Sequence, residues 1–480
     1  MSIFLENKLQ AELEWALEEN HFTYDELSVS VWDRSASLEK AEYIFKGKSF
    51  EAKKLKLNNI DVWTYFQEGD IVIGELHLDN PKFKVFAETP DEEEEDLQEE
   101  FEENILVKKI FVNNGNLQFK ETDTAKNQLY LEFSSLEVQD WKLNSKSLQG
   151  TIPFTYNSYK YQGDSLFIRL NKEHYINVGP VQLNNGSGNL TRLQLRSFFS
   201  RAEFQKQIPY EKDHFYADID SIQIKQLDWQ VENDSLILKN PLTEIFSANL
   251  KVYRDKLQPD DTRQKPMYSQ MIRELPVKVK FDTIRLRNTS ILYEERMHED
   301  REPGEIEFTQ LAASVYNFTN IGMDTEDFPQ TRIDVQTRFM GQAPLKVNWS
   351  FDVRNTADYF NISGNMGTIG YEQMNRFMKP AMNVEAKGNI DSMEFDFSGN
   401  RNEAEGEMKL VYKDFKVEVL RSDGSRKNKV LSALANLILN NDAETGDAAR
   451  DNIRVTRDKT KSFWNYFWLC IREGALKNFI

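Results

Sequence analysis

The stretch "FDTIRLRNTSILYEE", residues 281–295, has the spacing that decides the fold. Its large apolar residues are Phe281, Ile284, Leu286, Ile291 and Tyr293, and they surround one central amide residue, Asn288. Residues two apart share a face of a β-strand, so the pairs 284/286 and 291/293 would point to opposite faces of a straight strand. One extra residue, a β-bulge or tight bend at Asn288, returns both pairs to one side.

The same spacing occurs at three earlier places in the chain. The two apolar pairs of the four copies are Leu76, Leu78, Phe83 and Val85; Ile110, Val112, Leu117 and Phe119; Ile222, Ile224, Trp229 and Val231; and Ile284, Leu286, Ile291 and Tyr293. The central position is Asn80, Asn114, Gln226 or Asn288, and their surroundings ("LDNPKF", "VNNGNL", "RNTSI") suit a bend. Chance matches in a β-rich chain are the alternative explanation.

Two-residue alternation of apolar and polar side chains dominates residues 105–420, with turn formers such as "NNGSGN" between the runs. We therefore predict a mainly β fold. It is a long, curled antiparallel sheet of repeated strand-bend-strand units, groove-like, with short helices at the N- and C-termini. Within the β region, "YEQMNRFMKPAM" is the best candidate for a short helix.

Four regions are predicted along the chain. Residues 1–90 form a helix, with leucines at 5, 9, 13 and 17, followed by strands; residues 91–104 form an acidic linker. Residues 105–420 form the repetitive β body, and residues 421–480 form a helical segment, with a helical period over 428–440. A calcium site in the acidic stretch is a weaker alternative, because no glycine-turned loop of oxygen ligands is visible.

Composition excludes several function classes. The formal net charge of −18 argues against a nucleic-acid partner. The single cysteine, Cys470, excludes internal disulfides and thiolate metal clusters. The sequence contains no run of ~18 apolar residues, so it predicts no transmembrane helix. The five histidines lack metal-binding spacing, so we expect no metal and no cofactor. We also expect no enzymatic activity, although carboxylate clusters leave a glycosidase pair as a third hypothesis.

The C-terminal stretch "SFWNYFWLCIREG", residues 462–474, predicts a helix that Ser462 begins and Gly474 ends. Two roles are open. In one, the helix packs on the sheet or closes the end of a groove. In the other, it lies at a lipid surface, because tryptophan favours the headgroup zone. The aromatic residues of such an interfacial helix are Phe463, Trp464, Phe467 and Trp468. The surrounding Lys459, Lys461, Arg472 and Lys477 would suit anionic lipid.

A sheet with one apolar face must cover that face with a second sheet, by closing into a barrel, or with another molecule such as a lipid chain. The first hypothesis is therefore an open groove that binds acyl chains along the apolar positions of the four repeats. The second hypothesis is a structural or interaction scaffold with a closed core filled by side chains, which binds partners at its edges.

Several stretches of the chain resemble AsmA-like envelope proteins. The segment from "NKLQAELEWALEEN" to "IVIGELHLDNPKF", which includes Pro81, is similar to the start of that family. The stretches "LYEERMHEDREPGEIEFTQLAASVYNFTN" and "NISGNMGTIGYEQMNRFMKPAMNVEAKGNIDSMEFDFSGN" resemble its Bacteroidetes-type members.

This resemblance implies a periplasmic protein, associated with the inner membrane, that resembles the AsmA and TamB group. Such a protein carries or shields phospholipid between the two membranes and supports outer-membrane assembly. The resemblance also implies an N-terminal membrane anchor, which this sequence lacks, and we expect that the anchor was removed just before Ile3. Phospholipid or another acyl-chain ligand, together with a membrane surface, is the expected partner.

Overall fold

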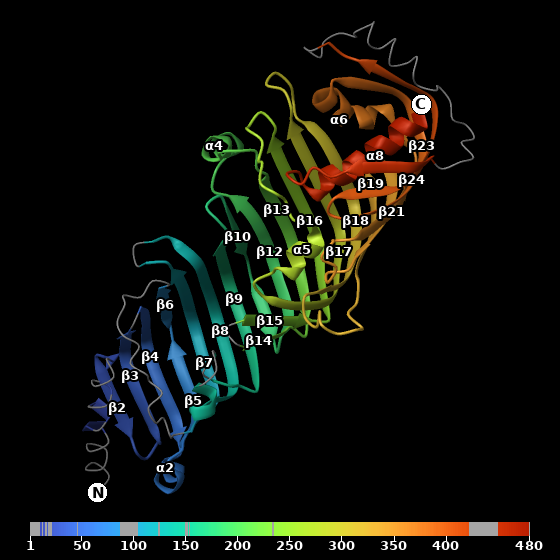
Figure 1. Ribbon diagram of the computed structural model, residues 1–480. Coiled ribbons are helices and arrows are strands. Elements are labelled where there is room, and N and C mark those ends of the chain that lie inside the picture. Colours follow the sequence, from blue (N-terminus) through green and yellow to red (C-terminus); the bar gives the residue numbers. More distant parts are fainter. Residues whose placement is uncertain are drawn as a thin grey trace. The chain divides into compact units, whose positions relative to one another are not determined.

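The computed structural model describes residues 22–86 without 46, 104–148 without 123 and 124, 152, 154–232, 235–421 and 450–479. It also describes Gln10, Ala11, Leu13, Glu14 and Leu17. The described strands number 25 and belong to a single mixed sheet (Figure 1). The mainly β fold predicted from the alternation is therefore confirmed.

The chain divides into two compact units, each described by itself below. The N-terminal unit comprises Met1–Gln194 and Gln223–Ile237, and the C-terminal unit comprises Leu195–Ile222 and Leu238–Ile480. Strands β12 (Ser187–Ser197), β13 (His214–Lys225) and β15 (Ser235–Asn240) have residues in both units.

The N-terminal unit consists mostly of long strands. Its other elements are β1 (Phe22–Thr23), β2 (Glu26–Ser30), β3 (Ser35–Phe45), β4 (Lys48–Ile60), α2 (Val62–Glu68), β5 (Ile71–Asp79), β6 (Lys82–Phe86), β7 (Ile105–Lys120), β8 (Asn127–Leu143), α3 (Ser145–Leu148), β9 (Ser158–Arg169), β10 (His174–Val178), β11 (Val181–Asn184) and β14 (Asp228–Glu232). The pairing order runs β2, β3, β4, β5 with β6, β7, β8 and β9.

The C-terminal unit adds helices to its strands. Its elements are α4 (Arg201–Gln207), β16 (Leu242–Asp255), α5 (Tyr268–Arg273), β17 (Lys278–Arg296), β18 (Gly304–Thr319), β19 (Thr331–Phe339), β20 (Ala343–Phe351), β21 (Phe360–Met366), β22 (Ile369–Gly370), α6 (Tyr371–Met382), β23 (Val384–Gly399), β24 (Glu403–Val419), β25 (Arg450–Thr456) and α8 (Phe463–Phe479). The pairing order runs β16, β17, β18, β19, β20, β21, β23, β24 and β25.

The predicted antiparallel pairing holds for most neighbouring strands, but three pairs are parallel, so the sheet is mixed. β7 runs parallel to β5 and β6, and β17 runs parallel to β16. A parallel neighbour requires a crossover connection of about a dozen residues or more. Residues 87–104 precede β7 and residues 256–277 precede β17, so both connections are long enough. Alternation within a strand does not reveal the direction of its neighbour.

The predicted bend at the central amide residue is confirmed in all four repeats. The backbone dihedral φ is 49° at Asn80, 53° at Asn114, 54° at Gln226 and 52° at Asn288. This left-handed conformation is costly for most side chains, and asparagine tolerates it best after glycine. A single left-handed residue shifts the alternation by one, so the apolar pairs on either side share a face.

The bends of adjacent strands lie side by side. Asn80 and Asn114 occupy neighbouring positions, because Asp79 faces Asn113 and Lys82 faces Asn116. In the C-terminal unit, the register of β17 with β18 shifts between Leu286 and Thr289, and Gln310 of β18 has φ 52° at the same level. Aligned bulges of this kind bend neighbouring strands together.

The helical predictions have mixed outcomes. Residues 371–382 form α6, as predicted, and residues 463–479 form α8. In the N-terminal segment, the few described residues are helical, and Leu17 packs against Leu27, Leu38 and Ala41. The helix predicted over 428–440 and the acidic linker of 91–104, apart from Asn104, lie outside the described residues. The four predicted regions therefore remain predictions.

Candidate functional site

One face of the N-terminal unit has a continuous cluster of apolar side chains, which we call the N-terminal apolar face. Leu78, Val112 and Phe133 form its buried centre. The half-buried residues packed around this centre are Phe50, Leu55, Leu76, Ile110, Leu131, Leu136 and Tyr161. All members come from strands, namely β4, β5, β7, β8 and β9. Four predicted groove residues, Leu76, Leu78, Ile110 and Val112, are thereby brought together.

The parallel pairing of the first two repeats brings their equivalent positions together. Leu76 lies opposite Ile110 and Leu78 opposite Val112. Beyond the bend, Phe83 lies opposite Leu117 and Val85 opposite Phe119. Because directly opposite residues of neighbouring strands point to the same face, each apolar position is extended into a row across the sheet.

The second halves of these repeats continue the same face. Phe83 lies opposite Phe50, with ring centroids 5.2 Å apart, and Phe50 belongs to the N-terminal apolar face. Leu117 lies opposite Leu131, another member. Phe119 is 37% exposed and lies near the end of its strand.

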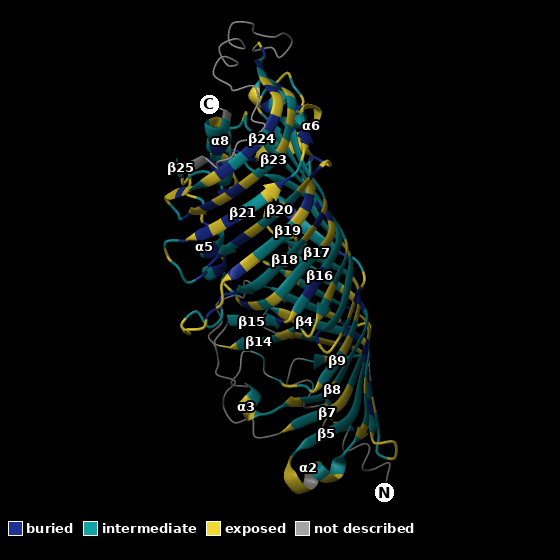
Figure 2. Ribbon diagram, turned by 90° about the vertical axis from the view of Figure 1, so that its right-hand side faces the viewer, coloured by how far each residue is buried: buried dark blue, intermediate teal, exposed yellow. Residues whose placement is uncertain are grey.

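The N-terminal apolar face has little cover among the described residues. α2 contacts β5, and the helical residue Leu17 packs in the neighbouring cluster of Leu27, Leu38 and Ala41, which Leu55 also joins. Figure 2 accordingly shows β5, β7 and β8 mostly in the colour of half-buried residues. A sheet face covered by a second layer would be buried more completely, because protein interiors pack without gaps.

Aromatic rings fill the glycine positions of this face. A Cβ atom added to Gly115 would lie 2.2 Å from Cζ of Phe133, so glycine allows the ring to lie flat over the neighbouring strand. A Cβ atom at Gly163 would lie 2.5 Å from the Tyr161 hydroxyl oxygen. That hydroxyl has no hydrogen-bond partner in the described part of the chain, and burial raises the pKa of Tyr161. It is therefore available as a hydrogen-bond donor within an apolar surface.

The third repeat joins none of the buried clusters that the described residues form. Ile222 and Ile224 are half-buried on β13, and Trp229 and Val231 are half-buried on β14. The ring of Trp229 packs against Tyr156 at a centroid distance of 6.5 Å.

The fourth repeat lies on β17 in the C-terminal unit. Ile284 and Leu286 face Val315 and Ala313 of β18. Beyond the bend, Ile291 faces Phe308 and Tyr293 faces Ile306.

Both halves of this repeat point to one side of the sheet. Ile333, which faces Val315, packs against the core under α8, and Ile306 packs against Met340, Ala343, Met366 and Ile369. Met374 of α6 packs against both clusters. Burial raises the pKa of Tyr293, whose hydroxyl donates a hydrogen bond to Glu295 over 3.1 Å.

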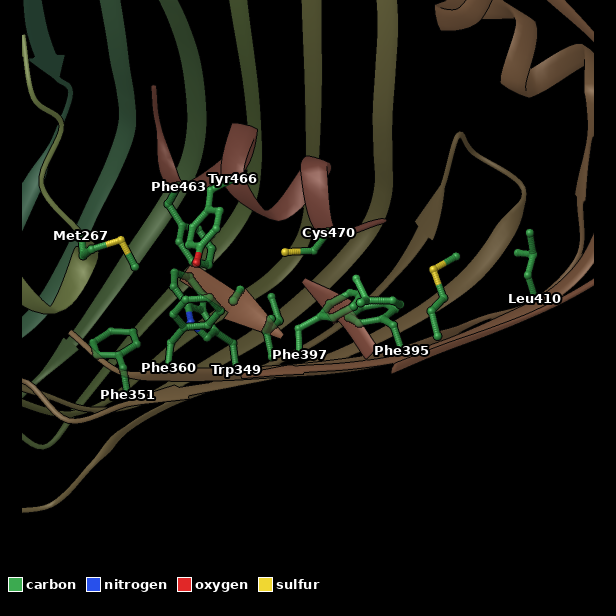
Figure 3. Close-up of a cluster of buried hydrophobic side chains, with 14 of the residues drawn as sticks. Met267, Trp349, Phe351, Phe360, Phe395, Phe397, Leu410, Phe463, Tyr466 and Cys470 are labelled. Atoms are coloured by element: carbon green, nitrogen blue, oxygen red, sulfur yellow. The ribbon is translucent and has the colours of Figure 1, made fainter. Parts of the chain in front are cut away.

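In the C-terminal unit, α8 packs on the sheet through its own side chains. Phe463, Tyr466 and Cys470 of α8 point toward the sheet (Figure 3). The ring of Phe463 stacks on Trp349 at 4.7 Å and meets Phe360 edge-on at 5.2 Å. Burial raises the pKa of the Cys470 thiol to about 12. We call this cluster the C-terminal core; its strand residues include Trp349, Phe351, Phe360, Ile362, Phe395, Phe397, Met408, Leu410 and Tyr412.

The C-terminal helix therefore packs on the sheet, the first of its two predicted roles. Ser462 begins the helix as predicted, because its Oγ accepts a hydrogen bond from Asn465 N over 3.3 Å. The predicted end at Gly474 is wrong, since α8 continues to Phe479. A Cβ atom at Gly474 would lie 2.5 Å from Met408 Sδ, so this glycine allows the close approach of helix and sheet.

The outer side of α8 retains aromatic exposure. Trp464 is 53% exposed and Trp468 is 40% exposed, whereas Phe463 is buried and Phe467 packs against the core. The indole nitrogen of Trp464 donates a hydrogen bond to the Tyr268 hydroxyl over 2.9 Å. A role for these tryptophans at a lipid surface stays a prediction.

Several contributors to the apolar surfaces were missed in the sequence. Phe50, Leu55, Phe133 and Tyr161 lie on strands whose alternation is visible but whose register is not. A further copy of the repeat occupies β16, where Thr243, Ile245, Leu250 and Val252 face the four apolar positions of β17. Its bend residue is Ser247, with φ 52°. A search that required an amide at the centre overlooks this copy.

Comparison with protein-family models finds no match for this chain, and comparison with curated proteins finds none either. The resemblance to AsmA-like proteins therefore stays a prediction from the quoted motifs. In the described part of the chain, no helix has both the length and the apolar composition needed to cross a bilayer.

Proposed function

We propose that this chain is a non-enzymatic lipid-binding protein that holds phospholipid acyl chains against the N-terminal apolar face. The observation that supports the proposal most directly is the row of half-buried aliphatic and aromatic side chains with little protein cover. The row crosses β4, β5, β7, β8 and β9, which corresponds to four inter-strand spacings, or roughly 19 Å. That length suits one extended acyl chain.

The hydrophobic effect favours such binding. Covering apolar surface contributes about 25 cal/mol per Å², so an acyl chain that covers on the order of 200 Å² of this face would gain roughly 5 kcal/mol. No bond is made or broken, and movement of lipid would follow differences in its chemical potential. The unpartnered Tyr161 hydroxyl could donate a hydrogen bond to an ester carbonyl at one end of the chain.

The cellular setting is part of the proposal. The motifs that resemble AsmA-like proteins support a periplasmic location, association with the inner membrane through an anchor, and a role in lipid transport for outer-membrane biogenesis. A periplasmic scaffold with a closed core is the second candidate. The observation that favours it is the C-terminal core, where side chains of α8 and of the sheet are buried against one another.

The test combines lipid detection with a face-specific substitution. Native mass spectrometry of the purified protein should show bound phospholipid, and a fluorescent fatty acid should bind to the lipid-free protein. Leu117→Asp places a charge on the apolar face and should reduce fatty-acid binding by at least tenfold, because the carboxylate must lose water when an acyl chain covers it.

Phe111→Asp is the matched control. Phe111 lies on the same strand as Leu117, but it is adjacent to Ile110 and Val112 and therefore points to the other face, where its ring stacks on His77 at 4.9 Å. This control should fold and bind fatty acid like the wild type. A lipid-free spectrum without fatty-acid uptake, or equal loss in both variants, would reject the proposal and favour the scaffold.

A further inference from the structure

The C-terminal unit has a second feature, a cavity of about 200 Å³ lined by Arg201, His214, Tyr216 and Lys251. No carboxylate is among these lining residues, although the chain has 78 acidic and 60 basic residues. Two strands and one short helix supply the lining: β13 contributes His214 and Tyr216, β16 contributes Lys251, and α4 begins at Arg201.

The two arginines near the cavity are held in place by neighbouring groups. The Arg201 guanidinium donates to Glu294 Oε1 over 3.0 Å and lies 4.6 Å from the centroid of the Tyr253 ring. The Arg196 guanidinium lies 3.8 Å from the centroid of the Tyr216 ring and forms an ion pair with Asp218. Each guanidinium therefore already binds one carboxylate, so these two arginines add no unpaired positive charge to the cavity.

Lys251 differs from these arginines. Its ammonium lies 5.9 Å from the centroid of the Tyr216 ring, and among the described residues Lys251 forms no ion pair. Three cationic side chains, Arg196, Arg201 and Lys251, therefore lie at or beside the cavity. Only two described carboxylates, Asp218 and Glu294, pair with them. Such a half-buried lysine at a cavity is suited to a negatively charged ligand.

We propose that this cavity binds a phosphate group. A phosphate has several oxygen acceptors, and the Lys251 ammonium lies at this cavity beside three groups that already have partners: the Arg201 guanidinium binds Glu294, the Tyr216 hydroxyl donates to Asp218, and His214 Nε2 interacts with the Phe199 carbonyl. The volume of about 200 Å³ leaves room for the phosphate and a small attached group or water molecules. Either a free phosphate ester or a phospholipid headgroup offers this chemistry.

The cavity lies on the sheet face opposite to the apolar positions of the fourth repeat. Lys251 faces Leu292 of β17, whereas Leu250 faces Ile291. Because adjacent residues of a strand point to opposite faces, the cavity is separate from the apolar surface on which Ile291 lies. Phosphate binding here is thus independent of the acyl-chain binding proposed above.

The pKa of His214 should respond to a phosphate bound in the cavity. Burial lowers the pKa of His214, and the nearby Arg201 lowers it further, while its Nε2 interacts with the Phe199 carbonyl oxygen at 3.2 Å. Tyr216, Lys251, Asp218 and Glu294 are the other polar groups around this cavity. A bound phosphate would favour the imidazolium and raise this pKa, because an adjacent anion stabilises the protonated ring.

The experiment is a calorimetric titration of the full chain with inorganic phosphate at constant ionic strength, with chloride as the reference anion. Lys251→Gln should weaken phosphate binding about tenfold or more, since one charge-assisted hydrogen bond is lost. Lys280→Gln, which changes an exposed lysine of β17, is the matched control and should bind phosphate like the wild type. Phosphate should also raise the pKa of His214, followed by NMR of labelled histidine.

Two further probes distinguish the sources of the phosphate. Glycerol 3-phosphate tests a soluble ester, and phosphatidylcholine vesicles with or without phosphatidic acid test a headgroup. Binding of glycerol 3-phosphate that is tighter than binding of chloride supports the proposal, and so does tighter binding to vesicles with phosphatidic acid than to vesicles without it. The proposal is overturned if phosphate binds no better than chloride, if Lys251→Gln and Lys280→Gln weaken binding equally, or if His214 does not respond. Leu117→Asp should leave phosphate binding intact, so failure of the acyl-chain proposal would be recognised separately.

Discussion

The N-terminal apolar face and the C-terminal core are built from the same kind of strand but are covered differently. In the C-terminal core, Phe397, Ile362 and Tyr412 are at most 2% exposed because α8 packs over them. On the N-terminal apolar face, Leu76 and Ile110 remain half-buried, and only strand residues contribute to the cluster. Alternating strands thus create an apolar face, and a separate element decides whether that face is closed.

The comparison also shows what a closing element needs. α8 approaches β24 closely at Gly474, stacks Phe463 on Trp349, and has Lys461 just before its first turn. Lys461 forms ion pairs with Glu211 over 3.2 Å and with Asp260 over 2.7 Å. Among the described residues, no helix packs on the N-terminal apolar face as α8 packs on the C-terminal core.

The largest expected effect is a loss of stability from a substitution in the C-terminal core. Phe397→Ala should lower the free energy of unfolding by about 3–5 kcal/mol, because a fully buried ring is replaced by a cavity. Ile110→Ala on the half-buried face should cost only about 1–2 kcal/mol, since less area is removed from water in the folded state. Urea unfolding followed by tryptophan fluorescence measures both. Equal losses would show that the N-terminal apolar face is as well covered as the core.

The second prediction concerns fatty-acid binding to the N-terminal apolar face. A fatty acid at a hundred times its dissociation constant should stabilise the protein that binds it by about 2.7 kcal/mol. Amide hydrogen exchange should slow in β5, β7 and β8, while the amides of β21, β23 and β24 should exchange at unchanged rates. Slowing confined to the C-terminal strands would place the ligand elsewhere and contradict the proposed site.

The third prediction concerns the bends, which both units share. Asn114→Val and Asn288→Val should each destabilise the fold by about 1–2 kcal/mol, because a β-branched residue is strained at a φ near 50°. The Gly variants at both positions should be tolerated, since glycine adopts this conformation without strain. Thermal unfolding of the four variants tests the pattern. A neutral valine at either position would mean that the bend is not required there.

The smallest effect is a pH dependence of the covered end. Burial alone would raise the pKa of Glu211, but hydrogen bonds and ion pairs with Lys256 and Lys461 outweigh it, so the pKa lies below its ordinary value. A lowered pKa in the folded state stabilises the fold above the unfolded value of about 4.3 and loses this contribution as the pH falls further. Stability should therefore decline between about pH 5 and pH 3 more steeply in the wild type than in Glu211→Gln.

The control for this pH effect is Glu302→Gln, at an exposed carboxylate. Its stability should follow the wild-type pH profile in urea titrations at each pH. If Glu211→Gln also follows that profile, the two lysines do not stabilise the ionised form of Glu211.

Much of the fold was predictable because its signals are local. The odd offset between Leu286 and Ile291 predicts a bend, and Asn288 is a residue that tolerates a left-handed backbone. The site was predictable only in part. Leu76 and Ile110 were identified as apolar positions, but their partners Phe50 and Phe133 were missed, because register with a neighbouring strand depends on contacts distant in sequence.

The direction of the strands shows the same division. Alternation along β7 and β17 is identical for a parallel and an antiparallel neighbour, so the sequence did not reveal their parallel pairing. Gly474 has the residue type of a helix end, yet α8 continues past it because the glycine allows contact with Met408. In both cases a long-range contact overrides or complements a local preference.

By itself, the amino-acid sequence determined the repeated bent strands and their apolar side, since both depend on spacing and backbone preference within about a dozen residues. Only the tertiary structure decided which apolar side is closed. Closure depends on whether a distant segment such as α8 returns to pack on the sheet, and that free energy comes from long-range contacts.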